Sequence, residues 1–165
     1  MSLAKAKKGI QKCEQAQAFK DNPVPFEPKN LGKAVNNELD QYWPSLSLDG
    51  KTMVYTVMLI DSTRKDLFGN FAHQEDFYQT VYNEGNWLPG KALGPPINTS
   101  GNEGAQQISA DGKTLVFTGC NRTDGFGNCD IYFSKKTPDG WSKPENIGPL
   151  VNSRFSEKQP CLSPD

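Results

Sequence analysis

Apolar residues recur with a helical period at the start of this chain and with a strand period in the rest. Residues 3–20 place Ala6, Ile10 and Cys13 at three- and four-residue steps, which predicts a helix. The apolar stripe is thin, so this helix either packs on a partner or frays as a free terminus. Closely spaced prolines then end the helix and predict an extended, semi-rigid connection over residues 22–30.

Beyond the connection, short runs of alternating or apolar residues predict two sets of four strands. Asp111-Gly112 supplies the positive φ angles of a tight turn, and Asp49-Gly50 does so in the first set. Ile131 and Phe133 alternate with polar neighbours, as in a half-buried strand. The predicted strands are 43–48, 52–59, 76–82 and 87–92 in the first set, and 105–109, 114–119, 129–136 and a short strand from 141 in the second.

One phrase of fixed spacing occurs three times over the same region. It begins at Leu31-Gly32, Leu93-Gly94 and Ile147-Gly148, and in each copy an asparagine follows the glycine by four residues and a serine by fifteen. The first two copies continue to Asp76-Phe77-Tyr78 and Asp130-Ile131-Tyr132, each with a tryptophan eleven residues after the aspartate. The first copy is longer by eight residues, all of them between its second and third predicted strands.

This repetition predicts an all-β fold of four-stranded antiparallel sheets, the blades of a partial β-propeller, preceded by a short α-helix. A lone sheet cannot bury both of its faces, so we expect further blades to follow in the parent protein. A β-sandwich or an open solenoid of similar hairpins is the rival architecture. The expected parts are the last helix of a helical region at 1–21, a linker at 22–30 and a propeller segment at 31–165, with blades at about 31–92 and 93–146 and the start of a third at 147–165.

Composition agrees with a turn-rich β-protein and removes two classes of partner. The 165 residues include 15 Gly and 12 Pro, and hydrophobic residues make up 35%. The net charge of −1 gives no positive field that would attract nucleic acid or an anionic membrane. No apolar run approaches the ~20 residues of a membrane span. We therefore expect neither nucleic acid binding nor direct membrane insertion.

The repeated phrase resembles the TolB-like, WD-like propeller repeat, whose core reads Ser-Pro-Asp-Gly-Lys, an apolar strand and Asp-Ile-Tyr. In this chain the core is Ser109–Lys113 with Asp130-Ile131-Tyr132. Further phrases are similar to the propeller segment of large outer-membrane lipoproteins of the Bacteroides and Porphyromonas group: Leu93–Thr99, Asn102–Ala105 and Cys120–Gly125. The eight extra residues of the first copy, and Leu48 where that family often has proline or a small residue, depart from its pattern.

The resemblance covers about residues 8–165 and carries expectations about the whole protein. In that family a tetratricopeptide helical array precedes the propeller, and an OmpA-like peptidoglycan-binding domain ends the chain. The resemblance implies that residues 3–20 are the last helix of such an array. It also implies a bacterial location in the periplasm, the outer membrane or the cell surface, with cell-envelope proteins as partners. Peptidoglycan would be close only through a domain that this sequence does not contain.

Cysteine spacing suggests one covalent link and no metal site. Cys120 and Cys129 flank a predicted hairpin turn, which places them opposite each other and favours a disulfide, with two free thiols as the alternative. Such a bond would contribute roughly 2–3 kcal/mol and would indicate an oxidising compartment. The single histidine, His73, lies in the insertion, so we expect no zinc and no cofactor. Residues 124–130 resemble a calcium loop only superficially, and turn formation explains them better.

Two sets of equivalent residues are candidates for binding. Gln41, Glu103 and Glu157 each lie six residues before the serine of their copy, on the edge that would face the channel mouth of a propeller. They are the predicted partner-binding residues, with ordinary solvated loop side chains as the alternative. Trp87 and Trp141 also recur, which is typical of packing between blades, with a sugar-stacking platform as the alternative.

No group of residues predicts catalysis, because the chain has no nucleophile elbow and no phosphate loop. The leading hypothesis is a non-catalytic interaction or scaffold module of a cell-envelope protein, with the partner bound at the channel face. The alternative is a carbohydrate-binding or glycoside-cleaving propeller, since paired carboxylates can form a glycosidase site. A third hypothesis is a structural spacer.

Overall fold

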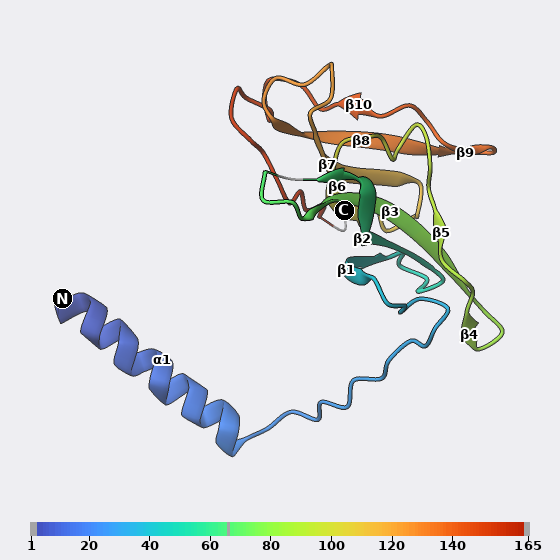
Figure 1. Ribbon diagram of the computed structural model, residues 1–165. Helices are drawn as coiled ribbons and strands as arrows, with labels where there is room; N and C mark the ends of the chain where they lie inside the picture. Colours follow the sequence, from blue (N-terminus) through green and yellow to red (C-terminus); the bar gives the residue numbers. More distant parts are fainter. Residues whose placement is uncertain (1–2, 66, 164–165) are drawn as a thin grey trace. The chain divides into compact units, whose positions relative to one another are not determined.

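The computed structural model describes residues 3–65 and 67–163, which divide into one unit up to Asn30 and a second from Leu31 (Figure 1). The first unit contains one helix, α1 (Leu3–Asp21), with no buried residue. An extended segment follows, as the prolines from Pro23 onward require. No helix among the described residues combines the length and apolarity that a membrane span requires.

The second unit is mostly β-structure and consists of two antiparallel sheets whose strands follow one another along the chain (Figure 1). The first sheet has the order β1-β2-β3-β4, and β5 also pairs with β3. The second has the order β6-β7-β8-β10, and β9 also pairs with β8. The strands are β1 (Asp40–Leu46), β2 (Thr52–Lys65), β3 (Phe71–Asn83), β4 (Asn86–Trp87), β5 (Lys91–Ala92), β6 (Glu103–Ile108), β7 (Thr114–Cys120), β8 (Cys129–Thr137), β9 (Gly140–Trp141) and β10 (Glu145–Asn146).

The fourth strand position of each sheet is split into two short pieces. Pro89 lies between β4 and β5, and Pro144 lies between β9 and β10. A proline has no backbone N–H to donate to the ladder, so it interrupts the strand. The single fourth strand that the sequence predicts at 87–92 is therefore two pairs of residues that both hydrogen-bond to β3.

The eight extra residues of the first copy form strand and not only loop. The sequence predicts strands at 52–59 and 76–82, whereas β2 runs to Lys65 and β3 begins at Phe71. Regular pairing continues to Asp61↔Ala72, and an irregularity then leads to a last pair, Lys65↔Phe71. β-branched and aromatic residues in this stretch favour the strand conformation. The insertion thus lengthens the β2–β3 hairpin beyond its neighbour β1.

The hydrophobic core lies between the two sheets. Val54 and Phe77 from the first sheet, and Leu115 and Phe117 from the second, are completely buried. The rings of Phe77 and Phe117 meet edge to face with centroids 5.4 Å apart. Each such side chain contributes roughly 1.5–3 kcal/mol on burial. A smaller cluster covers the other face of β2, and its buried members are Val35, Met53, Tyr55 and Val57.

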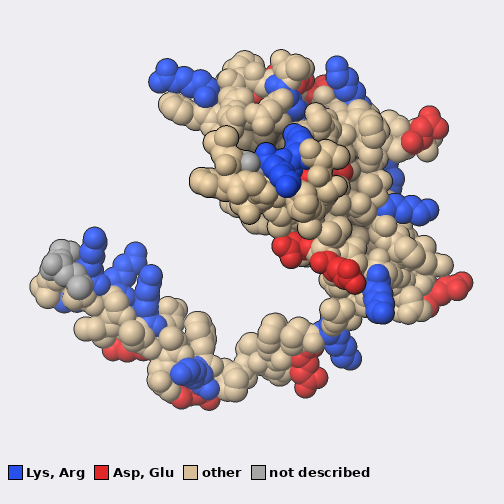
Figure 2. All heavy atoms as spheres, in the orientation of Figure 1, with Lys and Arg blue, Asp and Glu red and all other residues tan. Residues whose placement is uncertain are grey.

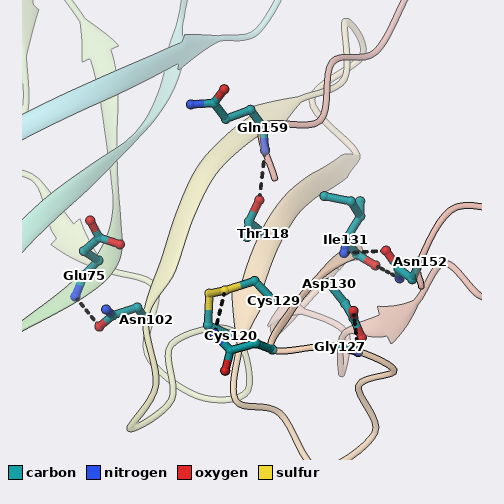
Figure 3. Close-up of a disulfide and its surroundings, with 11 residues drawn as sticks. Glu75, Asn102, Thr118, Cys120, Gly127, Cys129, Asp130, Ile131, Asn152 and Gln159 are labelled. Carbon is teal, nitrogen blue, oxygen red and sulfur yellow. Dashed lines mark hydrogen bonds between the residues drawn. A yellow bond between two sulfur atoms is a disulfide. The ribbon is translucent and has the colours of Figure 1, made fainter. Parts of the chain in front are cut away.

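The second and third copies of the phrase each hold the third strand of the preceding copy through an asparagine. The side-chain amide of Asn98 accepts from Phe77 N at 3.0 Å and donates to Phe77 O at 3.1 Å. Asn152 makes the same two bonds to the backbone of Ile131, both at 2.8 Å (Figure 3). Because the second and third copies repeat this arrangement, residues 147–163 lie on the second sheet as residues 93–109 lie on the first.

The segments just before the repeated serine are also joined between consecutive copies in an equivalent way. Ser45 Oγ accepts from Ile108 N at 2.9 Å, and Gln107 Oε1 accepts from Leu162 N at 2.6 Å. Ser45 and Gln107 both lie two residues before the serine of their copy. The repetition in sequence is therefore a repetition of contacts between neighbouring copies.

Figure 2 shows Lys and Arg interspersed with Asp and Glu on the visible face of the second unit.

Candidate functional site

Each copy of the phrase contains, shortly before its serine, a residue in the left-handed region that is not glycine. Trp43, Ala105 and Gln159 have φ of 55°, 50° and 63°, and each lies four residues before the serine of its copy. This conformation costs an L-residue roughly 1–2 kcal/mol. The pairing of β1 with β2 and of β6 with β7 shifts register at this place. Such bulges redirect side chains, and strained positions of this kind concentrate at functional sites.

Gln106 attaches the first bulge to the second sheet. Its buried amide nitrogen donates to Trp43 O at 2.7 Å and to Val54 O at 2.9 Å. Thr56 Oγ1 donates to its amide oxygen at 3.0 Å. Thr118, the counterpart of Thr56, accepts from Gln159 N at 3.1 Å (Figure 3). The surrounding hydrogen bonds therefore hold the strained backbone in place from the neighbouring unit.

A hollow of about 220 Å³ lies beside these bulges. It is bounded by side chains from three copies of the phrase, and residues on its wall include Tyr42, Trp43, Glu75, Asn102, Lys158 and Gln159. The side chain of Trp43 is 43% exposed and Lys158 is exposed, so an aromatic surface and an ammonium group are both accessible there.

Glu75 is the best-fixed charged group of the hollow. Tyr42 Oη donates a hydrogen bond to Glu75 Oε1, and Asn102 Oδ1 accepts from Glu75 N at 3.3 Å (Figure 3). Burial and the neighbouring Glu75 carboxylate raise the pKa of Tyr42, so its hydroxyl keeps its proton and remains a donor. A Cβ at Gly104 would lie 3.3 Å from Glu75 Oε2, so glycine leaves room for the carboxylate. The hollow can therefore stack on and hydrogen-bond to a polar group of a partner.

The predicted binding residues Gln41, Glu103 and Glu157 occupy equivalent places, and each bonds back to the turn of its own copy. Glu103 is completely buried, and its carboxylate accepts from Thr99 N at 3.0 Å and from Thr99 Oγ1 at 2.6 Å. Glu157 accepts from Ser153 N and Oγ at 2.9 and 2.6 Å.

The amide of Gln41 is paired with Asn37, the counterpart of Thr99 and Ser153. The Ser153 bonds lower the pKa of Glu157, which stays ionised. These three side chains hold the turns of their own copies, and they are not among the residues that line the hollow.

Glu103 also forms an ion pair that the sequence did not reveal. Arg122 Nη2 lies 3.0 Å from Glu103 Oε1 and 2.6 Å from Ile97 O, with only 11% of the arginine side chain exposed. The guanidinium lies over the rings of Phe117 and Tyr132 at 5.3 and 5.0 Å. Burial raises the pKa of Glu103, and the Thr99 bonds and the arginine charge oppose that rise. This pair is a structural connection between a turn and the loop after β7.

A disulfide joins Cys120 and Cys129 at the ends of β7 and β8, with 4.0 Å between their Cα atoms (Figure 3). Next to the loop that this bond closes, the Asp130 carboxylate accepts from two loop amides, Phe126 N at 2.5 Å and Gly127 N at 3.1 Å. The carboxylate of Asp130 thus caps a turn. The described residues include no group of three or more His, Cys, Asp or Glu side chains that could hold a metal ion.

The two repeated tryptophans are half-buried packing residues. Trp141 packs against the core between the sheets, and Lys136 Nζ lies 6.0 Å from the centre of its ring. Trp87 packs against the smaller cluster, with its ring centroid 5.2 Å from that of Tyr82. A second hollow of about 410 Å³ is lined in part by Trp141.

Comparison with known proteins adds no relative to this picture. No protein-family model matches the chain, and no curated protein matches its sequence.

Proposed function

We propose that the two sheets are adjacent blades of a β-propeller and that the chain is a non-catalytic protein-interaction module of a bacterial cell-envelope protein. The observation that carries the architecture is the repetition of contacts between copies. The same positions of the phrase form the same hydrogen bonds to a neighbouring copy, through Asn98 and Asn152 and through Ser45 and Gln107. Repeats that stack through identical contacts are the construction of propellers and solenoids.

The partner binds at the hollow on the first strands, which lie nearest the axis of a propeller. The support for this place is the left-handed backbone at Trp43, Ala105 and Gln159, which is a β-bulge at the first two, together with the fixed carboxylate of Glu75. Gln41, Glu103 and Glu157 contribute indirectly, because each holds the turn of its copy and is a chain neighbour of a residue that lines the hollow. The Cys120–Cys129 bond supports an oxidising compartment, in keeping with a periplasmic or surface location.

The test is capture of one envelope protein by the wild-type chain and by two matched variants. Trp43→Asn removes the aromatic surface but keeps a residue that tolerates positive φ. Leu48→Asn, at an 84% exposed position in the β1–β2 turn, is the control. We expect Trp43→Asn to lose the partner that Leu48→Asn retains. Equal capture by both variants would remove the hollow as the binding site.

A carbohydrate-binding propeller is the second candidate, and the 410 Å³ hollow at Trp141 favours it. Lys91 and Lys136 also line that hollow, so a sugar could stack on the indole and place an acidic group near the lysines. A glycan array comparing the wild type with Trp141→Ala tests this. Binding of no glycan, or equal binding by both proteins, rejects the carbohydrate function.

A further inference from the structure

The lengthened hairpin of the first copy has an open backbone edge. Pairing of β1 with β2 ends at Asp40↔Met58, whereas β2 and β3 remain paired to the end of β2 at Lys65. Along residues 59–65, no strand of the described part of the chain pairs with the other edge of β2. We call this two-stranded extension, residues 59–65 and 67–74, the arm, and Figure 1 shows it in green.

The end of the arm displays two large apolar side chains. Leu67 is 101% exposed and Phe68 is 90% exposed, and Ile60 on β2 is 57% exposed. Burial of a leucine or a phenylalanine side chain stabilises a fold by roughly 1.5–3 kcal/mol. Because Leu67 and Phe68 are exposed, they contribute little of this stabilisation to the folded chain. Apolar side chains gathered on a projecting element mark an interaction site.

Local interactions hold the end of the arm in one conformation. Asp61 accepts from Thr63 N at 2.9 Å, from Thr63 Oγ1 at 2.5 Å and from Arg64 Nε at 2.6 Å. Lys65 Nζ lies 5.4 Å from the centre of the Phe71 ring. A preorganised support lowers the entropic cost of binding, so the arm is suited to a specific contact.

We propose that the arm binds a protein partner, which adds a β-strand along Leu59–Lys65 and covers Leu67 and Phe68 with an apolar pocket. Addition of a strand to an open edge is a recurring mode of recognition, in which the backbone supplies affinity and side-chain pockets supply specificity. This surface lies outside the hollow of the first strands, so its test is independent of that site.

Charge and backbone chemistry favour a protein over a lipid surface. Residues 59–71 contain two acidic and two basic side chains, which are Asp61, Asp66, Arg64 and Lys65. They sum to no net charge, so an anionic leaflet does not attract the arm. An open strand edge also cannot enter hydrocarbon, because its backbone groups would lose their hydrogen bonds, whereas a partner strand satisfies them.

Photo-crosslinking in native cells identifies the partner. A photoreactive phenylalanine analogue replaces Leu67 in the full chain, and the control chain carries it at Leu150, which is 100% exposed and lies outside the arm. We expect one adduct of defined mass from position 67 and not from position 150, identified by mass spectrometry.

The purified partner then gives the quantitative test by titration calorimetry. Loss of two buried anchors should weaken binding at least tenfold in the double variant Leu67→Ser/Phe68→Ser, while Leu150→Ser binds as the wild type does. Hydrogen exchange at the amides of residues 59–65 should slow when the partner is bound, and circular dichroism checks that each variant is folded.

Three results overturn the proposal: the same adducts from both positions or none from position 67, unchanged affinity of the double variant, or unchanged exchange along residues 59–65. Sedimentation with phosphatidylcholine vesicles, with and without phosphatidylglycerol, tests whether the arm binds a lipid surface instead. If the wild type sediments with them and the double variant does not, the arm binds lipid and the protein partner is rejected.

Discussion

The two copies build the same sheet but end the hairpin between their second and third strands in opposite ways. In the second copy, a disulfide closes the loop after β7, and Arg122 within that loop pairs with the buried Glu103. In the first copy, no cysteine stands there, and β2 and β3 continue into the arm. The contacts between sheets fix the common part. The end of the hairpin between the second and third strands lies beyond those contacts. It is closed by the disulfide in the second copy and extended into the arm in the first.

The same contrast holds at the first strands. Gln41 and Glu103 are equivalent residues, but Gln41 is half-buried and uncharged, whereas Glu103 is completely buried and ionically paired. Equivalent positions in the repeat therefore give the two side chains the same structural role, which is to hydrogen-bond to the turn of their own copy. The neighbouring loop decides whether the side chain also carries a charge into the interior.

Replacement of the buried carboxylate should produce the largest difference between the copies. Glu103→Ala leaves the Arg122 guanidinium buried without its partner, which should cost about 3–5 kcal/mol of unfolding free energy. Gln41→Ala removes only hydrogen bonds at a half-buried position and should cost about 1 kcal/mol or less. Urea denaturation of both variants measures the difference, and similar losses would show that the ion pair does not distinguish the copies.

Removal of the disulfide should have the next largest effect. The bond joins residues nine positions apart, and Cys120→Ser/Cys129→Ser should lower the unfolding free energy by roughly 2–3 kcal/mol. Cys161→Ser is the matched control, because Cys161 is an exposed free thiol. Calorimetric unfolding compares the two. If the double variant melts with the control, the closed loop contributes nothing that its hydrogen bonds do not already supply.

Shortening of the arm should change stability least among the structural changes. Asp61 and Ala72 are directly opposite, so Asn-Gly in place of residues 62–71 connects them by a tight hairpin turn. Because the removed side chains are largely exposed, we expect the unfolding free energy to stay within about 1 kcal/mol of the wild type. A larger loss by urea denaturation would mean that the arm supports the sheet.

Acid should loosen the end of the arm only at low pH. The bonds from Thr63 and then Arg64 lower the pKa of Asp61 from 3.8 to about 2. A lowered pKa means that the ionised form is favoured in the fold, so this local stabilisation is present above pH 4 and is lost as the pH falls towards 2. The amide resonance of Thr63, followed by NMR, should titrate with a midpoint near 2. The Asp61→Asn variant should show no such titration.

Much of the fold follows from the sequence because periodicity and spacing are properties of the backbone repeat. Two antiparallel sheets formed by consecutive strands were predicted, and the structure contains them. The fourth strands differ because Pro89 and Pro144 interrupt them, a signal that was present in the sequence. β2 and β3 extend beyond the predicted strands 52–59 and 76–82, because β-branched and aromatic residues between them favour strand.

The candidate site was less accessible from the sequence. Spacing located Gln41, Glu103 and Glu157 at one edge, but it could not show that each side chain turns back to its own loop. Gln106 has proline at the equivalent positions of the other two copies, namely Pro44 and Pro160. That difference is the one signal that could have marked it. Three hydrogen bonds across 50 or more residues are a tertiary property that no local pattern encodes.

The hydrogen bonds of the two asparagines mean that the boundaries of the sequence repeat do not coincide with the boundaries of the folded sheets. Asn98 and Asn152 are encoded in the later copy but complete the third strand of the earlier one. A cut placed just before Gly94 or Gly148 would therefore damage the unit that remains. When a sheet is exchanged between such proteins, the junction should therefore lie after the asparagine, so that the transplanted sheet keeps the side chain that hydrogen-bonds to its third strand.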